Sequence, residues 1–127
     1  MIVGLGIDAV EIQRFEQWHN YDIKRLQNVF SLDEIEYALS VTSKSAERFA
    51  ARFAAKEAAY KALAVHMAQQ ITFLDFCKLV AVALDANGAP RLVVDLVAAK
   101  ISLDLQLLVS ISHTKTLAMA VVVAEAR

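Results

Sequence analysis

The sequence contains little cysteine, proline or glycine, the residues that form disulfides and tight turns in small folds. It has one cysteine, one proline and three glycines in 127 residues. The single cysteine, Cys77, excludes an internal disulfide and a cysteine-based metal site. The longest apolar run, Leu117 to Ala124, is too short to cross a bilayer. No basic leader precedes the first apolar segment. We therefore expect a cytoplasmic protein.

The chain also lacks an excess of either charge. Its 13 Lys and Arg residues and 14 Asp and Glu residues give a net charge of −1, which argues against non-specific nucleic-acid binding as its main activity. Apolar residues, in contrast, make up 57% of the chain. A small monomer cannot bury so much apolar surface, so we expect another subunit to cover part of it. The length predicts one domain over residues 1–127.

Apolar patterning predicts strands at both ends of the chain. The segment 2–10 is expected to be a buried strand that ends at Asp8. Two β-branched runs, 107–112 and 117–124, are expected to pair as antiparallel strands. Together with a long helix between them, these strands predict an α+β fold in which an antiparallel sheet packs against that helix.

The segment between the helix and the last two strands is less regular. A β region is expected over 71–74 and 78–84, followed by a type I′ hairpin turn at Asn87-Gly88. The segment 92–101 and the residues after it suggest a short strand and then a helix.

Two serines are candidate helix caps. Ser31 and Glu34 fit a capping box for a helix that ends at about residue 39 or 40. Ser45 is a candidate N-cap for the long central helix, which is expected to continue to about Met67.

The central helix places different chemistry on each side. Arg48, Arg52 and Lys56 form a cationic strip, whereas Glu57 and Lys61 share another flank. The strip fits either an anionic ligand or a solvated helix face. Small residues form the remaining surface, where another backbone can approach closely: Ala51, Ala54, Ala55, Ala58 and Ala62.

Asp8 and Glu57 are the candidate metal ligands. Each carboxylate lies on an otherwise apolar element, where it needs a partner or a metal ion. Two carboxylates plus phosphate oxygens suit Mg²⁺, and Lys61 could neutralise a phosphate nearby. The alternative is structural: a Glu57–Lys61 ion pair on the helix and Asp8 as a helix cap.

Other polar residues allow both functional and structural interpretations. His113 and Thr114 follow a strand, where they could hold a phosphate or simply complete a loop. Arg14, Lys24 and Arg25 could form a surface that binds an acidic partner, although exposed basic residues are common.

Taken in order, these segments resemble the bacterial holo-acyl-carrier-protein synthases, the small 4′-phosphopantetheinyl transferases. The resemblance covers essentially the whole chain. The motifs that carry it are Gly6-Ile-Asp-Ala-Val-Glu-Ile-Gln-Arg-Phe15, Phe30-Ser-Leu-Asp-Glu34 with Tyr37, Arg52-Phe-Ala-Ala-Lys-Glu-Ala-Ala-Tyr-Lys-Ala-Leu63, Asn87-Gly-Ala-Pro90, Val109-Ser-Ile-Ser-His-Thr114 and Met119-Ala-Val-Val-Val-Ala-Glu125.

The resemblance implies a reaction in which coenzyme A donates 4′-phosphopantetheine to a serine of apo acyl carrier protein and 3′,5′-ADP is released. It associates the reaction with fatty acid biosynthesis, while the carrier served stays open. It also implies a homotrimer with active sites at the subunit interfaces. The roles that it implies are Mg²⁺ binding by Asp8 and Glu57, phosphate stabilisation by Lys61, nucleotide-phosphate contacts by Arg52, His113 and Thr114, an adenine-side turn at Gly88 and Pro90, and carrier contact by Arg14.

The chain departs from the family pattern after Leu63. The family usually has a glycine-rich loop there, whereas this chain has Ala64-Val-His-Met-Ala-Gln-Gln70. The alternative function is therefore a non-catalytic relative that binds coenzyme A or a carrier without transfer.

Overall fold

A computed structural model describes all residues, 1–127. The elements in chain order are β1 (Ile2–Glu11), the 3₁₀ turns η1 (Ile12–Phe15) and η2 (Trp18–Asn20), α1 (Ile23–Leu26), α2 (Leu32–Leu39), η3 (Thr42–Lys44), α3 (Ser45–Leu63), η4 (Ala64–His66), α4 (Phe73–Cys77), β2 (Val80–Leu84), β3 (Pro90–Val94), β4 (Leu105–His113) and β5 (Leu117–Ala126).

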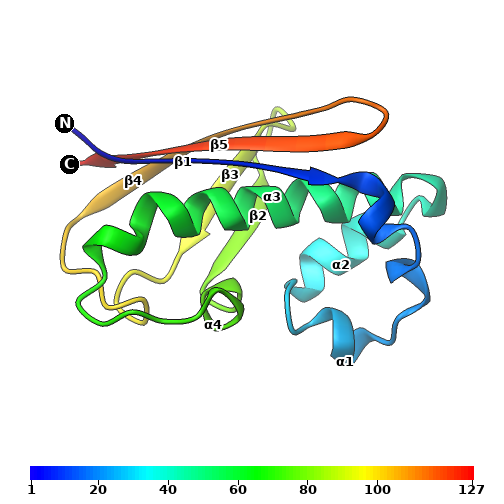
Figure 1. Ribbon diagram of the computed structural model, residues 1–127, viewed down its shortest axis with the longest axis horizontal. Coiled ribbons are helices and arrows are strands. Elements are labelled where there is room, and N and C mark those ends of the chain that lie inside the picture. The colour runs from blue at the N-terminus through cyan, green and yellow to red at the C-terminus, as the bar shows by residue number, and fades with distance from the viewer.

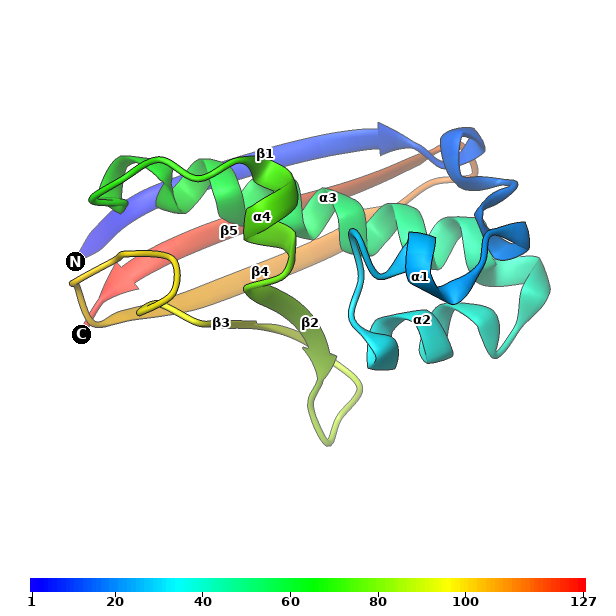
Figure 2. The same ribbon diagram turned by 90° about the horizontal axis from the view of Figure 1, so that it is seen from below.

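The expected antiparallel sheet on a central helix is confirmed. A three-stranded sheet has the order β1-β5-β4, and β2 and β3 form a separate hairpin. Both neighbours of β5 pair with it antiparallel. The long helix α3 runs along one face of the larger sheet, with α1 and α2 on its other side (Figures 1 and 2). None of the helices is long and apolar enough to cross a membrane.

Two glycines let β1 lie directly on α3. A Cβ atom added to Gly6 would lie 1.9 Å from the carbonyl oxygen of Ala58, and one added to Gly4 would lie 2.2 Å from that of Ala62. The alternate glycines thus mark a close backbone approach, as expected for glycine inside a strand. The approach brings Asp8, two residues after Gly6, alongside the middle of the helix.

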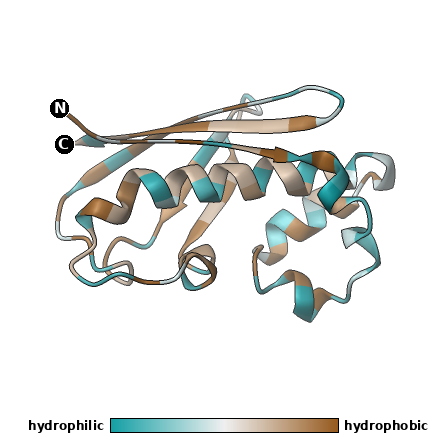
Figure 3. Ribbon diagram, viewed as in Figure 1, coloured by the Kyte–Doolittle hydropathy of each residue, from teal (hydrophilic) through white to brown (hydrophobic).

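The prediction for β1 is wrong in two respects. The strand continues past Asp8 to Glu11, because its ladder with β5 continues to the pair Glu11–Leu117. It is also buried on one face only, since Leu5 and Ile7 are each 66% exposed. Figure 3 shows that apolar colouring continues along β1 and β5.

The caps divide into one confirmed and one wrong prediction. Ser31 accepts from the backbone N–H of Glu34, and Glu34 accepts from that of Ser31, so the capping box is present. Ser45, in contrast, is the first residue of α3 and is buried, with Lys44 at the N-cap. The helix ends at Leu63, where the chain tightens into η4, rather than at Met67.

The region 71–104 differs most from expectation. The β region expected over 71–74 is wrong, since residues 73 and 74 belong to the helix α4; the Thr72 side chain caps this helix, and Phe76 packs against Tyr60. The β2–β3 turn is not type I′, since Gly88 has a positive φ and Asn87 does not. No helix follows β3; the segment closes in a turn with Lys100 at φ 60.

Candidate functional site

Asp8 and Lys61 meet where β1 crosses α3. The ammonium nitrogen Nζ of Lys61 lies 3.2 Å from Oδ1 of Asp8 and donates to the carbonyl oxygen of Ile7 at 3.0 Å. The Lys61 side chain is 49% exposed, whereas that of Asp8 is 16% exposed. The lysine is therefore held at the strand yet can still reach a ligand from solvent.

Glu57 faces the same place from α3. Its pKa is raised, first by burial and then by the nearby Asp8 charge, while Lys61 and Arg14 act in the opposite direction. The structure thus brings Asp8, Glu57 and Lys61 together, with Arg14 nearby. The structural alternative is not observed, because Lys61 pairs with Asp8 rather than with Glu57 and Asp8 lies inside a strand.

The two carboxylates fit a divalent cation that has other oxygen ligands. Oδ2 of Asp8 is buried and has no hydrogen-bond partner. The negative charge of Asp8 repels that of Glu57 and so disfavours the ionised form of Glu57. A cation bound by both carboxylates would remove this repulsion. No group of three or more His, Cys, Asp or Glu residues is arranged to hold a metal ion. A divalent cation at this place would take two carboxylate ligands from the protein and would need further oxygen ligands, for example from a phosphate.

Arg52 lies on another side of α3, against α2. Its guanidinium stacks on the ring of Tyr37 at 4.3 Å from the centroid, and Arg48 lies 4.1 Å from the same centroid. Arg52 is only 6% exposed, its Nε has no partner, and burial is the main cause that lowers its pKa. It borders a hollow of about 350 Å³ that Ser31, Tyr37 and β2 also line. An anion there would supply the missing acceptor.

Lys56 does not belong to a surface strip, so both sequence interpretations of it are wrong. Its side chain is 0% exposed and forms an ion pair with Glu34 at 2.7 Å. The pair is invisible in a helical projection, because Glu34 comes from α2 and the packing of α2 on α3 is a tertiary feature. In the sequence, the presence of Glu34 was the only hint of this ion pair, and the capping box already accounted for that residue.

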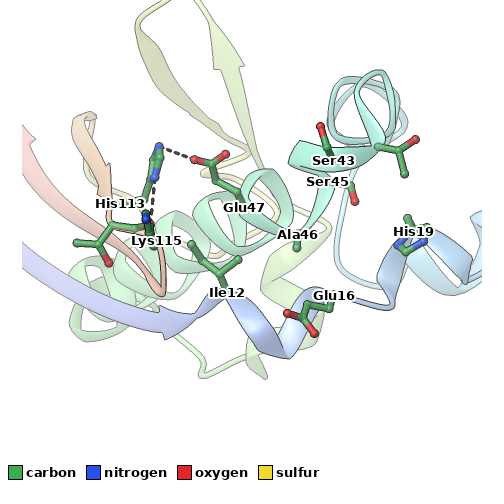
Figure 4. A pocket seen from close by; sticks show the side chains of 11 residues that line it. Ile12, Glu16, His19, Ser43, Ser45, Ala46, Glu47, His113 and Lys115 are labelled. Carbon is green, nitrogen blue, oxygen red and sulfur yellow. Dashed lines mark hydrogen bonds and ion pairs between the residues drawn. The ribbon is translucent and has the colours of Figure 1, made fainter.

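His113 and Thr114 lie at the end of β4, beside the turn that leads into β5. They line a hollow of about 660 Å³ at the first turn of α3 (Figure 4). Nε2 of His113 is 2.6 Å from Oε1 of Glu47, a partner that the sequence analysis missed. Glu47 and Glu57 are ten residues apart on one helix, which is roughly 15 Å along its axis at 1.5 Å per residue.

Within one chain the predicted site residues form separate groups. Asp8, Glu57 and Lys61 lie on one side of the β1–α3 contact. His113 is on β4, and β5 separates that strand from β1. Gly88 is in the exposed β2–β3 turn. The hollow at His113 is not lined by Asp8, Glu57, Lys61 or Gly88.

The three basic residues near the N-terminus are exposed. The guanidinium carbon of Arg14 lies 5.0 Å from the centroid of the Phe53 ring. The charge of Arg14 acts to lower the pKa of Glu57, against the effect of burial. Lys24 and Arg25 follow on α1, where Arg25 lies 3.7 Å over the ring of Tyr21. Of the three, Arg14 is the one placed near the carboxylate pair.

The segment after α3 is closed by side chains instead of glycines. Nε2 of His66 lies 2.7 Å from the carbonyl oxygen of Val3. The Gln70 amide donates to the carbonyl oxygen of Ala64 at 2.8 Å. These bonds tie the end of the helix to β1.

The single thiol has no part in this site. Burial raises the pKa of Cys77 to about 12, although the nearby Lys56 charge acts in the opposite direction. At pH 8 we expect native protein to react with a disulfide reagent at least about 10²-fold more slowly than urea-unfolded protein, since only the thiolate reacts. Equal rates in a stopped-flow thiol assay would contradict this.

Comparison with known proteins gives full-length matches. A family model, the 4′-phosphopantetheinyl transferase superfamily, matches residues 4–122. The holo-[acyl-carrier-protein] synthase of Treponema denticola is 44% identical over 128 residues, covering 98% of this chain and 99% of the relative. The Bacillus anthracis holo-(acyl-carrier-protein) synthase in complex with CoA (3′,5′-ADP) is 34% identical with a TM-score of 0.75, covering 100% and 99% of the two chains. The Helicobacter pylori synthase in complex with coenzyme A is 30% identical with a TM-score of 0.71, covering 95% and 99%.

Proposed function

The chain belongs to the 4′-phosphopantetheinyl transferase superfamily, and we propose that it acts as a holo-acyl-carrier-protein synthase. It transfers 4′-phosphopantetheine from coenzyme A to a serine of apo acyl carrier protein. The observation that carries the proposal is the meeting of Asp8, Glu57 and Lys61 at the β1–α3 contact. A relative that only bound coenzyme A would have little need for two converging carboxylates.

In this reaction a bond forms between the serine oxygen and the pantetheine-side phosphorus of the pyrophosphate. The bond from that phosphorus to the bridging oxygen breaks, its electron pair leaves with 3′,5′-ADP, and the serine proton passes to a base. Such a displacement depends on positioning and charge neutralisation more than on covalent catalysis.

Asp8 and Glu57 are suited to hold Mg²⁺, with pyrophosphate oxygens completing its ligands. When bound, the ion neutralises charge on the pyrophosphate. Lys61 is held next to Asp8 and is exposed enough to donate to the leaving phosphate. The serine proton has two candidate acceptors, the Glu57 carboxylate and a nearby water.

The nucleotide end of coenzyme A is assigned to Arg52, His113, Thr114 and the Gly88–Pro90 turn. These residues lie away from Asp8 in the same chain, as described above. We therefore assign a complete site to an interface, where the carboxylate pair of one subunit meets the nucleotide residues of the next. This arrangement supports a homotrimer.

The exposed face of the larger sheet is the surface we assign to that interface. Its apolar side chains on β1, β4 and β5 include Leu5, Ile7, Leu108 and Leu117. A face of this kind is costly to leave in water.

Replacing Ile7 with lysine is expected to convert the assembly into monomers, since a charge would be buried in an apolar contact. Transfer activity should fall with assembly, because each site would lose half of its residues. Light scattering at micromolar concentration measures the change. Glu36→Lys, on the exposed face of α2, is the matched control. A wild-type monomer would contradict the interface.

The carrier surface is assigned to Arg14, Lys24 and Arg25. Replacing Arg14 with alanine is expected to raise the KM for the carrier several-fold, roughly 1 kcal/mol for an exposed ionic contact. The KM for coenzyme A should stay the same. An equal rise in both KM values would place Arg14 at the nucleotide instead.

Mass spectrometry tests the function directly. An apo acyl carrier protein is incubated with the enzyme, coenzyme A and Mg²⁺, and a phosphopantetheine-sized mass gain on its serine is expected. The absence of this gain across carriers of fatty-acid, polyketide and other pathways would favour the non-catalytic alternative. The cytoplasmic location stays a prediction.

A further inference from the structure

We propose that the buried ion pair between Glu34 and Lys56 is a positioning element for both halves of the site. It rests on the transfer reaction proposed above. Neither residue faces the carboxylate pair or the hollow at His113; they act through the elements that carry those groups. Four observations support this role.

The first is that every donor of Lys56 is used. Its Nζ lies 2.7 Å from Oε1 of Glu34 and donates to the carbonyl oxygens of Val29 at 2.8 Å and Cys77 at 3.3 Å. An ammonium group has three donors, and each has an acceptor from a different segment. The side chain thus ties α3 to the loop before α2, to α2 and to the end of α4.

The second observation is that Glu34 also accepts hydrogen bonds from two backbone N–H groups. Its Oε1 accepts from the backbone N–H of Ser31 at 2.7 Å, and its Oε2 accepts from that of Val82 at 2.8 Å. Val82 lies in β2, the strand that leads into the turn with Gly88 and Pro90. One carboxylate therefore connects α3 with the strand that carries the nucleotide-side turn.

The third is the place of Lys56 in α3. Neighbouring helical residues point about 100° apart, at 3.6 residues per turn. Fixing Lys56 toward α2 and β2 therefore fixes the direction of the next side chain, Glu57, toward β1 and Asp8. A rotation of the helix would move Glu57 away from Asp8.

The fourth is that the contact between α3 and β1, taken by itself, specifies this rotation poorly. The α3 surface under β1 is built of alanines such as Ala54, Ala58 and Ala62, which offer no large side chains to lock against a neighbour. Directional polar contacts can supply the missing specificity. The pair also satisfies four backbone groups, so the test has to separate its effect on stability from its effect on catalysis.

The test replaces the pair by apolar side chains of similar size, Glu34→Leu with Lys56→Met. The double variant is expected to have a lowered Tm, because the N–H groups of Ser31 and Val82 and the carbonyl oxygens of Val29 and Cys77 lose their partners, so kcat is compared at equal fraction folded. Its kcat should then fall about tenfold to 10²-fold, the scale expected for a misplaced catalytic group. Titration calorimetry supplies a second readout, the gain in coenzyme A affinity on adding Mg²⁺, which should shrink with kcat.

Leu105→Ala is the matched control, because it empties core volume at the start of β4 without touching the pair. It should lower the Tm and leave kcat and the Mg²⁺-dependent gain unchanged in folded protein. If the double variant does not fold, Lys56→Met is compared with Leu105→Ala at equal fraction folded. Lys56→Arg keeps the charge and should recover part of the lost kcat.

The proposal is overturned if folded double variant keeps wild-type kcat and the wild-type Mg²⁺-dependent gain. It is also overturned if Lys56→Met loses no more than Leu105→Ala. Failure of the wild-type protein to modify any carrier is a different result, which would overturn the transfer reaction itself.

Discussion

Replacing Glu57 with glutamine is expected to lower the rate of phosphopantetheine transfer at least about 10²-fold, the scale measured for lost electrostatic catalytic groups. The substitution keeps the shape of the side chain and removes the charge that we assign to Mg²⁺. Mass spectrometry of the carrier at saturating coenzyme A gives the rate.

The same substitution should not weaken the fold. The pKa of Glu57 is raised by burial and by Asp8, so its charged form is less favourable in the folded protein than in the unfolded chain. For a carboxyl group of this kind, stability falls as the pH rises through its pKa. Glu57→Gln removes this loss, and its Tm at pH 8 should equal or exceed that of the wild type.

Glu36→Gln is the control, since Glu36 is exposed on α2 and no site residue depends on it. It should leave both rate and Tm unchanged. A Glu57→Gln protein that transfers within tenfold of the wild-type rate would remove Glu57 from the proposed metal site. A large loss of Tm would instead show that the carboxylate is mainly structural.

Replacing Gly6 with alanine is expected to damage stability and activity together. The new Cβ would lie 1.9 Å from the Ala58 carbonyl oxygen, 2.8 Å from its carbon and 3.0 Å from the Ala62 nitrogen. All three are backbone atoms, so no side-chain rotation can relieve the clash. Overpacking of this kind costs about 1–3 kcal/mol or more.

The strand must then move off the helix, and Asp8 moves with it. A shift of about 1 Å at a reacting group can cost about 10²-fold in rate. We expect Gly6→Ala to lose Tm in thermal denaturation and also to transfer slowly under conditions where it remains folded. An unchanged Tm would show that β1 and α3 are less closely packed than the structure has them.

Two control substitutions show whether the effects of Gly6→Ala come from its clash with the backbone of α3. Ala9→Ser changes the same strand on the face assigned to the subunit interface, away from α3, and should leave the β1–α3 contact and the Tm of the fold unchanged. Gly88→Ala meets no atom within 4 Å but has φ +80, so only backbone strain of about 1–2 kcal/mol is expected. Only Gly6→Ala should disturb the β1–α3 contact.

Local sequence patterns predicted some local features correctly. The Ser31 capping box depends on two residues three positions apart, and the antiparallel pairing of the last two strands depends on a short connection between them. The alternate glycines Gly4 and Gly6 predicted that a ligand or another backbone would approach this strand closely. They did not show that the partner would be the backbone of α3. Asp8, Glu57 and Lys61 could be named because each was a charged residue on an otherwise apolar element.

Predictions failed where a local signal was overruled from elsewhere in the fold. The segment 71–74 has strand-like composition, but residues 73 and 74 belong to α4, which Thr72 caps and whose Phe76 packs against Tyr60. Lys56 looked like part of a solvated strip, since helical spacing is the same for exposed and buried charges. Its partner Glu34 lies on another helix.

The sequence alone indicated the main strands and the central helix, the family, and the residues that carry charge into the apolar interior. The tertiary structure alone decided which of those charges neutralise one another: Lys61 with Asp8, and Lys56 with Glu34. The physical reason is that a charge in an apolar setting must find a partner. The sequence shows that need, whereas only the packing of separate elements brings the partner within 4 Å.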